Sequence, residues 1–93
     1  MAYIITGTAT FSSQTNRDAA LTRLNDAIAP YTLISRTTVG FPAGVDTPDA
    51  TTITVSFEGG TDDANAAAIS NAIYDAWVSK NRQTKGYLSV NKI

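Results

Sequence analysis

Residues 51–58, TTITVSFE, alternate between polar and apolar side chains along most of their length. One parity carries Ile53, Val55 and Phe57, whereas the other carries three hydroxyl groups and one carboxylate. A period of two is typical of a strand that buries one face and exposes the other. The segment therefore predicts a strand of an antiparallel sheet that packs its core on one side only.

Two segments upstream also have the character of strands. Residues 2–11, AYIITGTATF, alternate in the same way, and residues 31–41, YTLISRTTVGF, are rich in β-branched and aromatic residues. Residues 42–50, PAGVDTPDA, contain two prolines, a glycine and two aspartates, which are typical of a loop. The strand at 31–41 and the strand at 51–58 are therefore expected to form an antiparallel hairpin with an extended tip.

A helix is predicted between the first two strands. Leu21, Leu24 and Ile28 recur at helical spacing and form one apolar stripe. The polar residues 12–15, SSQT, precede this stripe, and their threonine or either serine is a suitable N-cap. Pro30 lacks the amide hydrogen that a helix interior needs, so the helix should end just before it.

A second helix is predicted downstream of the strand at 51–58. Residues 61–80 carry apolar residues at helical spacing, with Trp77 on the inner stripe. Thr61 is placed to cap the first turn of this helix. Gly86 interrupts the helical pattern, and the alternating residues 87–93, YLSVNKI, predict a last strand.

These segments give the order β-α-β-β-α-β in a single domain of residues 1–93. That order is similar to the ferredoxin-like α+β arrangement, which has a four-stranded antiparallel sheet in the order 4-1-3-2 and two helices on one face. The other face of the sheet is expected to stay open. The residues expected to form the core are Ile5, Leu24, Ile53, Val55, Phe57, Ile69, Ile73 and Leu88.

The composition excludes several classes of chemistry. The chain has no cysteine and no histidine, which removes disulfides, thiolate nucleophiles, the commonest zinc ligand and every Ser-His pair. Seven basic and eight acidic residues give a net charge of −1, without the basic surplus that phosphate binding needs. We therefore expect no cofactor, no metal site and no specific nucleic acid. The sequence also lacks the pattern of a signal peptide or membrane span, so we expect no membrane partner and a cytoplasmic location.

Hydroxyl side chains dominate the face of the predicted sheet that the helices leave open. RNA-recognition versions of this arrangement stack bases on aromatic residues of the two central strands, where this chain has threonines. A solvated face of good strand formers explains these residues without any function. A protein-binding face explains them as well, because small side chains of low charge lose little on desolvation. In that interpretation the binding residues are Ile4, Thr6, Thr8, Ile34, Arg36, Thr38, Thr52, Thr54 and Tyr87.

Two smaller clusters are candidate ligand sites. The predicted topology brings Ser12 and Ser13, at the start of the first helix, near Arg82 and Lys85, which would suit an anion. Ordinary helix capping and dipole compensation explain the same four residues. The two aspartates of the 42–50 loop would suit a divalent cation, but aspartate is also a usual turn residue.

The hypothesis that fits these features best is a non-enzymatic protein-interaction module that acts through a sheet edge or the open face. Residues 32–39 would form a long edge strand with little protection, so the expected partner is another protein or a second copy of the chain. The composition, rich in threonine and alanine, resembles that of small phage proteins and favours a virus-encoded accessory or inhibitory protein. The alternative is a dimeric α/β-barrel enzyme or ligand-binding domain, which this chain resembles in element order, with a pocket between facing sheets.

Overall fold

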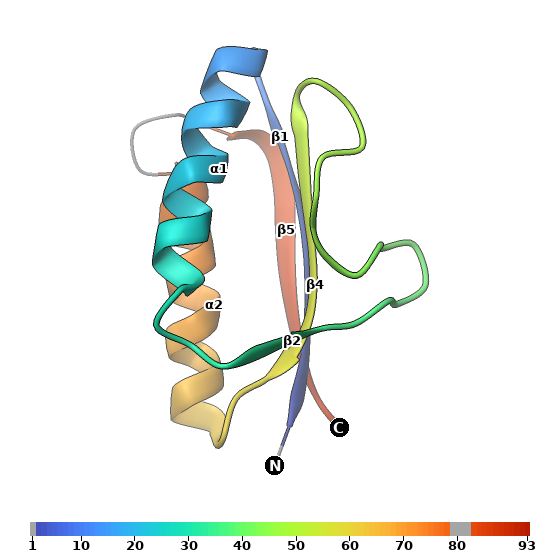
Figure 1. Cartoon of the computed structure of the whole chain (residues 1–93), viewed down its shortest axis with the longest axis vertical. Coiled ribbons are helices and arrows are strands. Elements are labelled where there is room, and N and C mark those ends of the chain that lie inside the picture. The colour runs from blue at the N-terminus through green and yellow to red at the C-terminus, as the bar shows by residue number, and fades with distance from the viewer. Residues whose placement is uncertain (1, 79–82) are drawn as a thin grey trace.

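Two helices lie against one face of an antiparallel sheet (Figure 1). The computed structural model describes residues 2–78 and 83–93. The elements follow one another as β1 (Tyr3–Phe11), α1 (Gln14–Ile28), β2 (Leu33–Ser35), β3 (Gly44–Asp46), β4 (Thr52–Gly59), α2 (Asp63–Val78) and β5 (Gln83–Lys92). The sheet has the order β2-β4-β1-β5, and β3 pairs with β4 on the same edge as β2.

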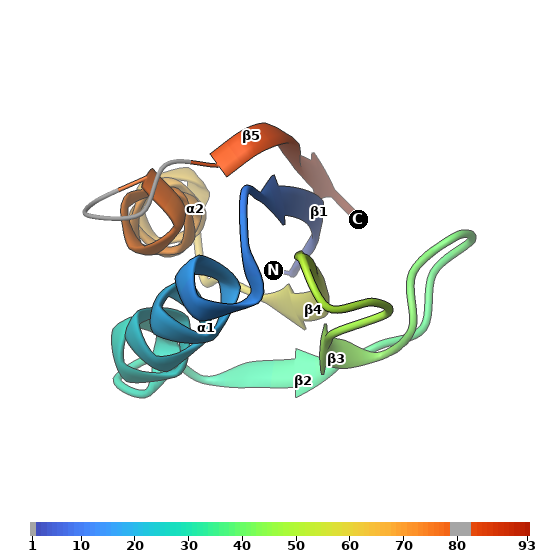
Figure 2. The same ribbon diagram turned by 90° about the horizontal axis from the view of Figure 1, so that it is seen from above.

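This architecture confirms the predicted α+β class with two helices and an antiparallel sheet. Seen from above, β2, β4, β1 and β5 follow one another, and both helices stand on the same side of them (Figure 2). The sheet has five strands and not the four expected, because the segment 42–50, predicted as a loop, contains β3. Val45 of β3 pairs with Val55 and packs against the core, so an apolar side chain anchors this short strand.

The predicted strand at 31–41 is much shorter than expected. It pairs with β4 only over β2, because the chain leaves the sheet edge after Ser35. Thr38 and Phe41 then exchange backbone hydrogen bonds of 3.1 and 2.9 Å across a tight turn. Gly40 in this turn has a φ of 86°, a conformation that favours glycine over any residue with a side chain. A local turn therefore replaces the second half of the predicted strand.

The last strand begins earlier than predicted. β5 starts at Gln83, and Gly86 pairs with Ala9 inside the strand and does not mark the end of a helix. Glycine adopts an extended backbone as readily as a turn, so the pairing with β1 decides its conformation. The described part of α2 ends at Val78, and the helix end predicted near residue 80 lies outside the described residues.

A polar side chain caps the start of each helix. Ser13 accepts a hydrogen bond from the backbone N–H of Asn16 at 3.1 Å, so the second serine of the SSQT segment caps α1. Asp62, and not the predicted Thr61, caps α2, because its carboxylate accepts from the N–H of Asn65 at 2.8 Å. A carboxylate at this position also opposes the positive end of the helix dipole.

The core fills the space between the sheet and the helices. All the predicted core residues are buried except Leu88, which is half-buried because it lies on the edge strand β5. Trp77 of α2 is fully buried and reaches β1 at Gly7, where an added Cβ atom would lie 2.9 Å from the indole Cη2. The missing side chain of Gly7 therefore makes room for the largest residue of the core.

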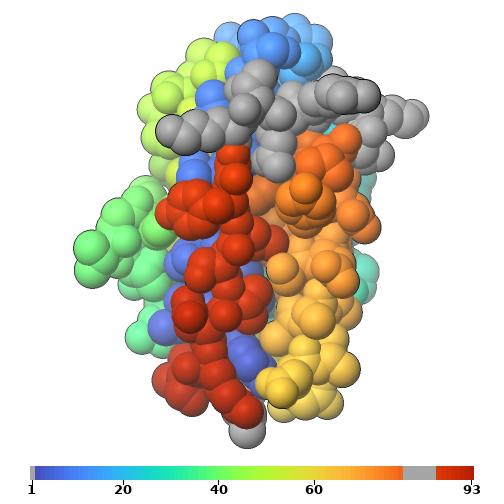
Figure 3. All heavy atoms as spheres, turned by 180° about the vertical axis from the view of Figure 1, so that it is seen from behind, coloured from blue at the N-terminus to red at the C-terminus, as the bar shows by residue number. Residues whose placement is uncertain are grey.

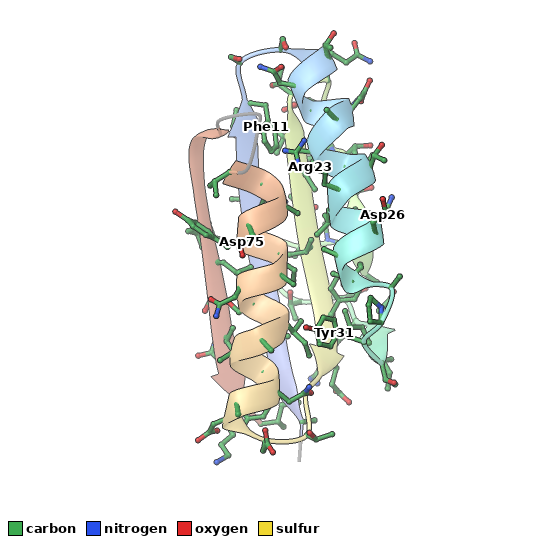
Figure 4. All side chains as sticks on the ribbon, turned by 90° about the vertical axis from the view of Figure 1, so that its left-hand side faces the viewer. Phe11, Arg23, Asp26, Tyr31 and Asp75 are labelled. Carbon is green, nitrogen blue, oxygen red and sulfur yellow. The ribbon has the colours of Figure 1, made fainter. Side chains whose placement is uncertain are left out.

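An arginine joins the two helices. The Nε and Nη2 atoms of Arg23 in α1 donate to the backbone carbonyl of Ala76 in α2, at 3.1 and 2.8 Å. Figure 4 shows the Arg23 side chain between the helices, while the exposed Asp26 and Asp75 lie on their outer sides. A cation at the C-terminal turn of α2 also stabilises the negative end of its dipole.

Candidate functional site

The strand register aligns side chains of the outer sheet face in rows. Thr54 of β4 stands opposite Thr8 of β1, which in turn stands opposite Tyr87 of β5. Ile34 of β2 stands opposite Glu58 of β4 in the same way. The paired strands thus bring together on one face these residues predicted to form a binding surface: Ile4, Thr6, Thr8, Ile34, Thr52, Thr54 and Tyr87.

The centre of this face is covered and not open as predicted. Residues 36–43, here called the arm, stand on the side of the sheet away from the helices (Figure 1). The arm leaves the edge of β4 and rejoins it at the same residue, Ser56. The carbonyl of Ser56 accepts a hydrogen bond from the N–H of Arg36 at 3.2 Å, and Ser56 also pairs with Gly44 of β3. Thr54 and Ser56 are only 7% and 0% exposed, so these hydroxyl side chains are buried.

Polar contacts hold the base of the arm. The guanidinium of Arg36 forms an ion pair with Glu58 at 2.6 Å. The hydroxyl of Ser56 donates to the Arg36 carbonyl, and it lies 3.0 Å from the hydroxyl of Thr38. Arg36 and Thr38 were both predicted to face a partner. In the folded chain their polar groups instead contact β4.

Apolar residues lie on the arm and beside it on the outer face. The ring of Phe41 packs edge-to-face against Tyr87, with 6.1 Å between ring centroids, so the arm reaches across to β5. Val39 at the tip is fully exposed, and Ile34 and Tyr87 are 61% and 53% exposed. Ile34 and Tyr87 lie beside the arm and Val39 forms its tip, so the outer face is an uneven surface and not a flat array of hydroxyl groups.

The long sheet edge predicted at residues 32–39 does not form. Only Leu33–Ser35 pairs with β4 in that segment, and the arm interrupts the rest of the edge. The opposite edge is β5, a strand of 10 residues that pairs with β1, and no other described strand pairs with its outer side. Figure 3 looks onto this outer side, where β5 runs along the molecule beside α2. The predictions from sequence omit this edge, although an order of 4-1-3-2 already places the last strand outermost.

The direction of the backbone groups on β5 follows from one hydrogen bond. The N–H of Ile93 donates to the carbonyl of Ala2 at 3.1 Å, so the backbone groups of Ile93 point toward β1. These directions alternate along a strand, and the register between β1 and residues 85–92 has no shift. The residues with outward N–H and C=O groups are therefore Gly86, Leu88, Val90 and Lys92.

A groove of about 400 Å³ lies beside this edge, between β5, β1 and the first half of α2. Ala66 and Ala67 of α2 leave the space because their side chains are short, and Val90 of β5 lines the groove opposite them. The remaining lining residues are polar and give the groove a hydrophilic rim: Tyr3, Asp63, Ser70, Asn71 and Lys92.

One carboxylate contacts two other residues that line the groove, at the end where α2 begins. Asp63 accepts a hydrogen bond from the Tyr3 hydroxyl, and the Nζ of Lys92 lies 3.8 Å from the same carboxylate oxygen. The hydrogen bond to Asp63, with burial and the nearby negative charges, raises the pKa of Tyr3 to about 12. These contacts tie the first residue of α2 to the start of β1 and the end of β5.

The predicted anion site is accounted for only in part. Ser13 caps α1, and Ser12 accepts a hydrogen bond from the side-chain amide of Asn16 in the first turn at 2.9 Å, so both serines are engaged at the start of the helix. Arg82 lies outside the described residues. The backbone of Lys85 is paired in β5, and its side chain also lies outside the described part of the chain. The serines therefore have a structural role of their own.

The aspartates near the 42–50 loop act in its local structure. The carboxylate of Asp49 accepts hydrogen bonds from the backbone N–H of Thr51 at 2.9 Å and from the Thr51 hydroxyl at 3.2 Å. The hydrogen bond from the N–H is the main reason why the pKa of this carboxyl is lowered. The backbone carbonyl of Asp49 accepts a hydrogen bond from the guanidinium of Arg17 at 2.7 Å. Arg17 is a buried residue of α1 that the sequence patterns did not single out. Asp46 ends β3. Among residues 2–78 and 83–93, no three potential metal ligands of the His, Cys, Asp or Glu types lie together.

Comparison with models of protein families, with curated proteins and with solved structures finds no significant match. Neither helix in the described part of the chain has the length and apolar character needed to cross a membrane. Function is therefore inferred from the geometry of the chain alone.

Proposed function

We propose that this protein is a non-enzymatic interaction module that binds an extended segment of polypeptide along the outer edge of β5. The observation that carries the proposal is the row of outward backbone groups from Gly86 to Lys92 next to a groove. An added strand would satisfy these groups by main-chain hydrogen bonds, which supply affinity in this mode of recognition. Alternate side chains of the added strand would point toward the groove and supply selectivity.

The outer edge of β5 has little of the usual protection of an exposed strand, because its two lysines, Lys85 and Lys92, stand only at the ends of the regular stretch. Natural sheet edges are shielded by prolines, bulges, short strands or inward-pointing charges. Residues 85–92 pair with β1 without a register shift and contain no proline. The one register shift lies between Thr10 and Phe11 of β1 and affects only the first residues of β5. An edge of this length and regularity is suited to binding a strand.

Two finer assignments belong to the same proposal. The sheet order supports a ferredoxin-like arrangement in which the arm splits the second strand into β2 and β3. Small size and low charge support a virus-encoded accessory or inhibitory role. The arm stands on the face through which two barrel halves would meet, so it argues against the alternative of a face-to-face dimer that encloses a substrate.

Selection from a displayed library of short random peptides tests the proposal. The selected peptides should alternate apolar and polar residues, and their binding should slow amide exchange at Leu88 and Val90 but leave exchange at Ser89 unchanged. The Val90→Pro variant should not bind, because proline removes an outward N–H and places its ring where the added strand would lie. Val90→Thr keeps both the N–H and the shape of the side chain, so it is the matched control.

Circular dichroism of both variants would establish that they fold. Peptides that bind Val90→Pro as tightly as the wild type would contradict the proposal. Binding without any change in amide exchange along β5 would contradict it as well, because strand addition has to protect the outward amides.

A further inference from the structure

We infer that the strand that occupies the β5 edge is β5 of a second copy of this chain, paired antiparallel about a two-fold axis at Ser89. The inference rests on the proposed function and adds the identity of the partner. Two-fold pairing requires that the edge be complementary to itself, because each residue meets its counterpart across the axis. Residues 86–92 and the adjoining face of α2 meet this requirement.

The backbone of β5 is complementary to itself in this register. Leu88 of one copy stands opposite Val90 of the other, and Gly86 stands opposite Lys92. All four residues have outward N–H and C=O groups, so each pair forms the hydrogen bonds of an antiparallel ladder. Ser89 meets Ser89 on the axis. No charged residue between 86 and 92 faces a like charge, and like charges directly opposite one another would be destabilising.

The hydrophobic core of the monomer is also incompletely covered at this edge. Leu88 and Val90 pack against the buried core but are only half-buried, since no strand lies beyond them. Pairing places Leu88 of each copy beside Val90 of the other on the helix side of the sheet. The apolar layer between sheet and helices then continues from one copy into the next, and the exposed flanks of both residues are covered.

The position of the axis along α2 follows from the geometry of the two elements. Asp63 at the start of α2 contacts Lys92, and Ser89 lies about 10 Å back along the strand from Lys92. A rise of 1.5 Å per residue makes this distance about seven residues of helix. The axis therefore passes α2 close to Ser70 and Asn71, which both line the groove beside Val90.

This position brings a large residue of one copy opposite a small residue of the other. Ala67 and Tyr74 lie at nearly equal distances on either side of the axis, on the helical stripe that includes Asn71. Tyr74 is 49% exposed, and Ala67 lines the groove. In the pair, Tyr74 of each copy therefore lies over the groove beside Ala67 of the other. The groove is the space that this aromatic ring fills.

Charge substitutions at these two positions test the pairing. Ala67→Glu and Tyr74→Lys should each raise the dimer dissociation constant about tenfold or more, as measured by sedimentation velocity over a range of concentrations. The double variant Ala67→Glu/Tyr74→Lys should recover most of the loss, because the new carboxylate of one copy faces the new ammonium of the other. Within one helix the two positions are two turns apart, about 10 Å, too far for an ion pair. Ala68→Glu, on an exposed position outside the groove, is the matched control and should leave the dimer unchanged.

Recovery in the double variant, together with slower amide exchange at Leu88 and Val90 in the dimer, would support the inference. A wild type that stays monomeric up to about 1 mM, or a dimer that neither single variant weakens, would overturn it. A monomeric wild type whose β5 amides are still protected by a selected peptide overturns only the second copy as partner. If neither a second copy nor a selected peptide protects the β5 amides, the proposed function is overturned as well.

Discussion

Replacing Gly7 with alanine tests how closely β1 packs against both α2 and β5. A Cβ atom at Gly7 would lie 2.7 Å from Cδ1 of Leu88, 2.8 Å from the carbonyl oxygen of Tyr87 and 2.9 Å from Cη2 of Trp77. Carbon atoms in favourable contact stand about 3.5–4.0 Å apart. The leucine can change rotamer, but a carbonyl of a paired strand and a fully buried indole ring can retreat only if β5 or α2 moves.

Such overpacking costs about 1–3 kcal/mol in the free energy of unfolding. In a domain of this size, each 1 kcal/mol lowers the melting temperature by about 4–8 °C. Urea unfolding of Gly7→Ala and of Thr8→Ala measures the effect, because Thr8 is the next residue and points to the outer face. Thr8→Ala should change stability by no more than about 0.5 kcal/mol. If Gly7→Ala costs no more than this control, the close packing of β1 is refuted.

A second substitution tests whether the indole ring causes the cost. Trp77→Phe removes Cη2, one of the three close contacts, and an indole N–H that has no partner among the described residues. The cost of Gly7→Ala should then be smaller in the Trp77→Phe background, with a coupling of at least about 0.5 kcal/mol. Strictly additive costs would show that the ring does not press on β1 and that β5 alone limits the space.

Three further predictions concern other parts of the fold. The hydrogen bond to Asp63 raises the pKa of Tyr3 from 10.0 to about 12, so its stabilisation is complete below pH ~10 and lost as pH rises through ~12. Tyr3→Phe should remove this alkaline step from the unfolding free energy measured against pH, and a step of the same size in the variant would contradict the assignment. Ser56→Ala removes the donor to the Arg36 carbonyl and should cost about 1–3 kcal/mol, with faster tryptic cleavage after Arg36; an unchanged cleavage rate would show that the arm is held by other contacts. Ile73→Ala, at a fully buried position, should cost about 2–5 kcal/mol in urea, and a loss below ~1 kcal/mol would contradict the core assignment.

The elements with regular hydrophobic periods could be predicted from sequence. The alternation of Ile53, Val55 and Phe57 placed β4 and its buried face, and the helical spacing of Ile69 and Ile73 placed α2. Each pattern is local, and burial of its apolar side is its main stabilisation. Packing in the folded chain agrees with these patterns, because the same face satisfies both the local period and the tertiary core.

The arm could not be predicted, because its contacts join residues that no period relates. The parity of residues 31–41 continues through Phe41, but Gly40 and Gly44, at φ of 86° and 77°, allow the chain to turn away from the sheet and return. As a result, the backbone of Ser56 is paired with both ends of the arm: it accepts a hydrogen bond from Arg36 and stands opposite Gly44 in the sheet. Two glycines around Pro42 are a sequence signal of an interruption, although they do not indicate which face the interrupted segment covers.

The candidate site was harder to predict than the fold, because a free edge is a property of the whole sheet. We interpreted threonines on the outer face, such as Thr6 and Thr54, as functional, yet both are buried in the folded chain. Nothing in the residues of β5 differs from an ordinary strand. Its significance comes from the strand order, which leaves its outer backbone groups without a neighbour among the described strands.

The two edges of the sheet therefore differ in a way that bears on assembly. On one side, β2 and β3 are three residues each and the arm stands between them, so no long row of backbone groups is available to another strand. On the other side, β5 offers a regular row next to a groove. A sheet with two such edges could add copies without limit, whereas a sheet with one can only close into a pair when its own edge is the partner. The arm and the β5 edge are thus complementary features. An interrupted edge on one side allows an unprotected edge on the other to be used for specific pairing without open-ended aggregation.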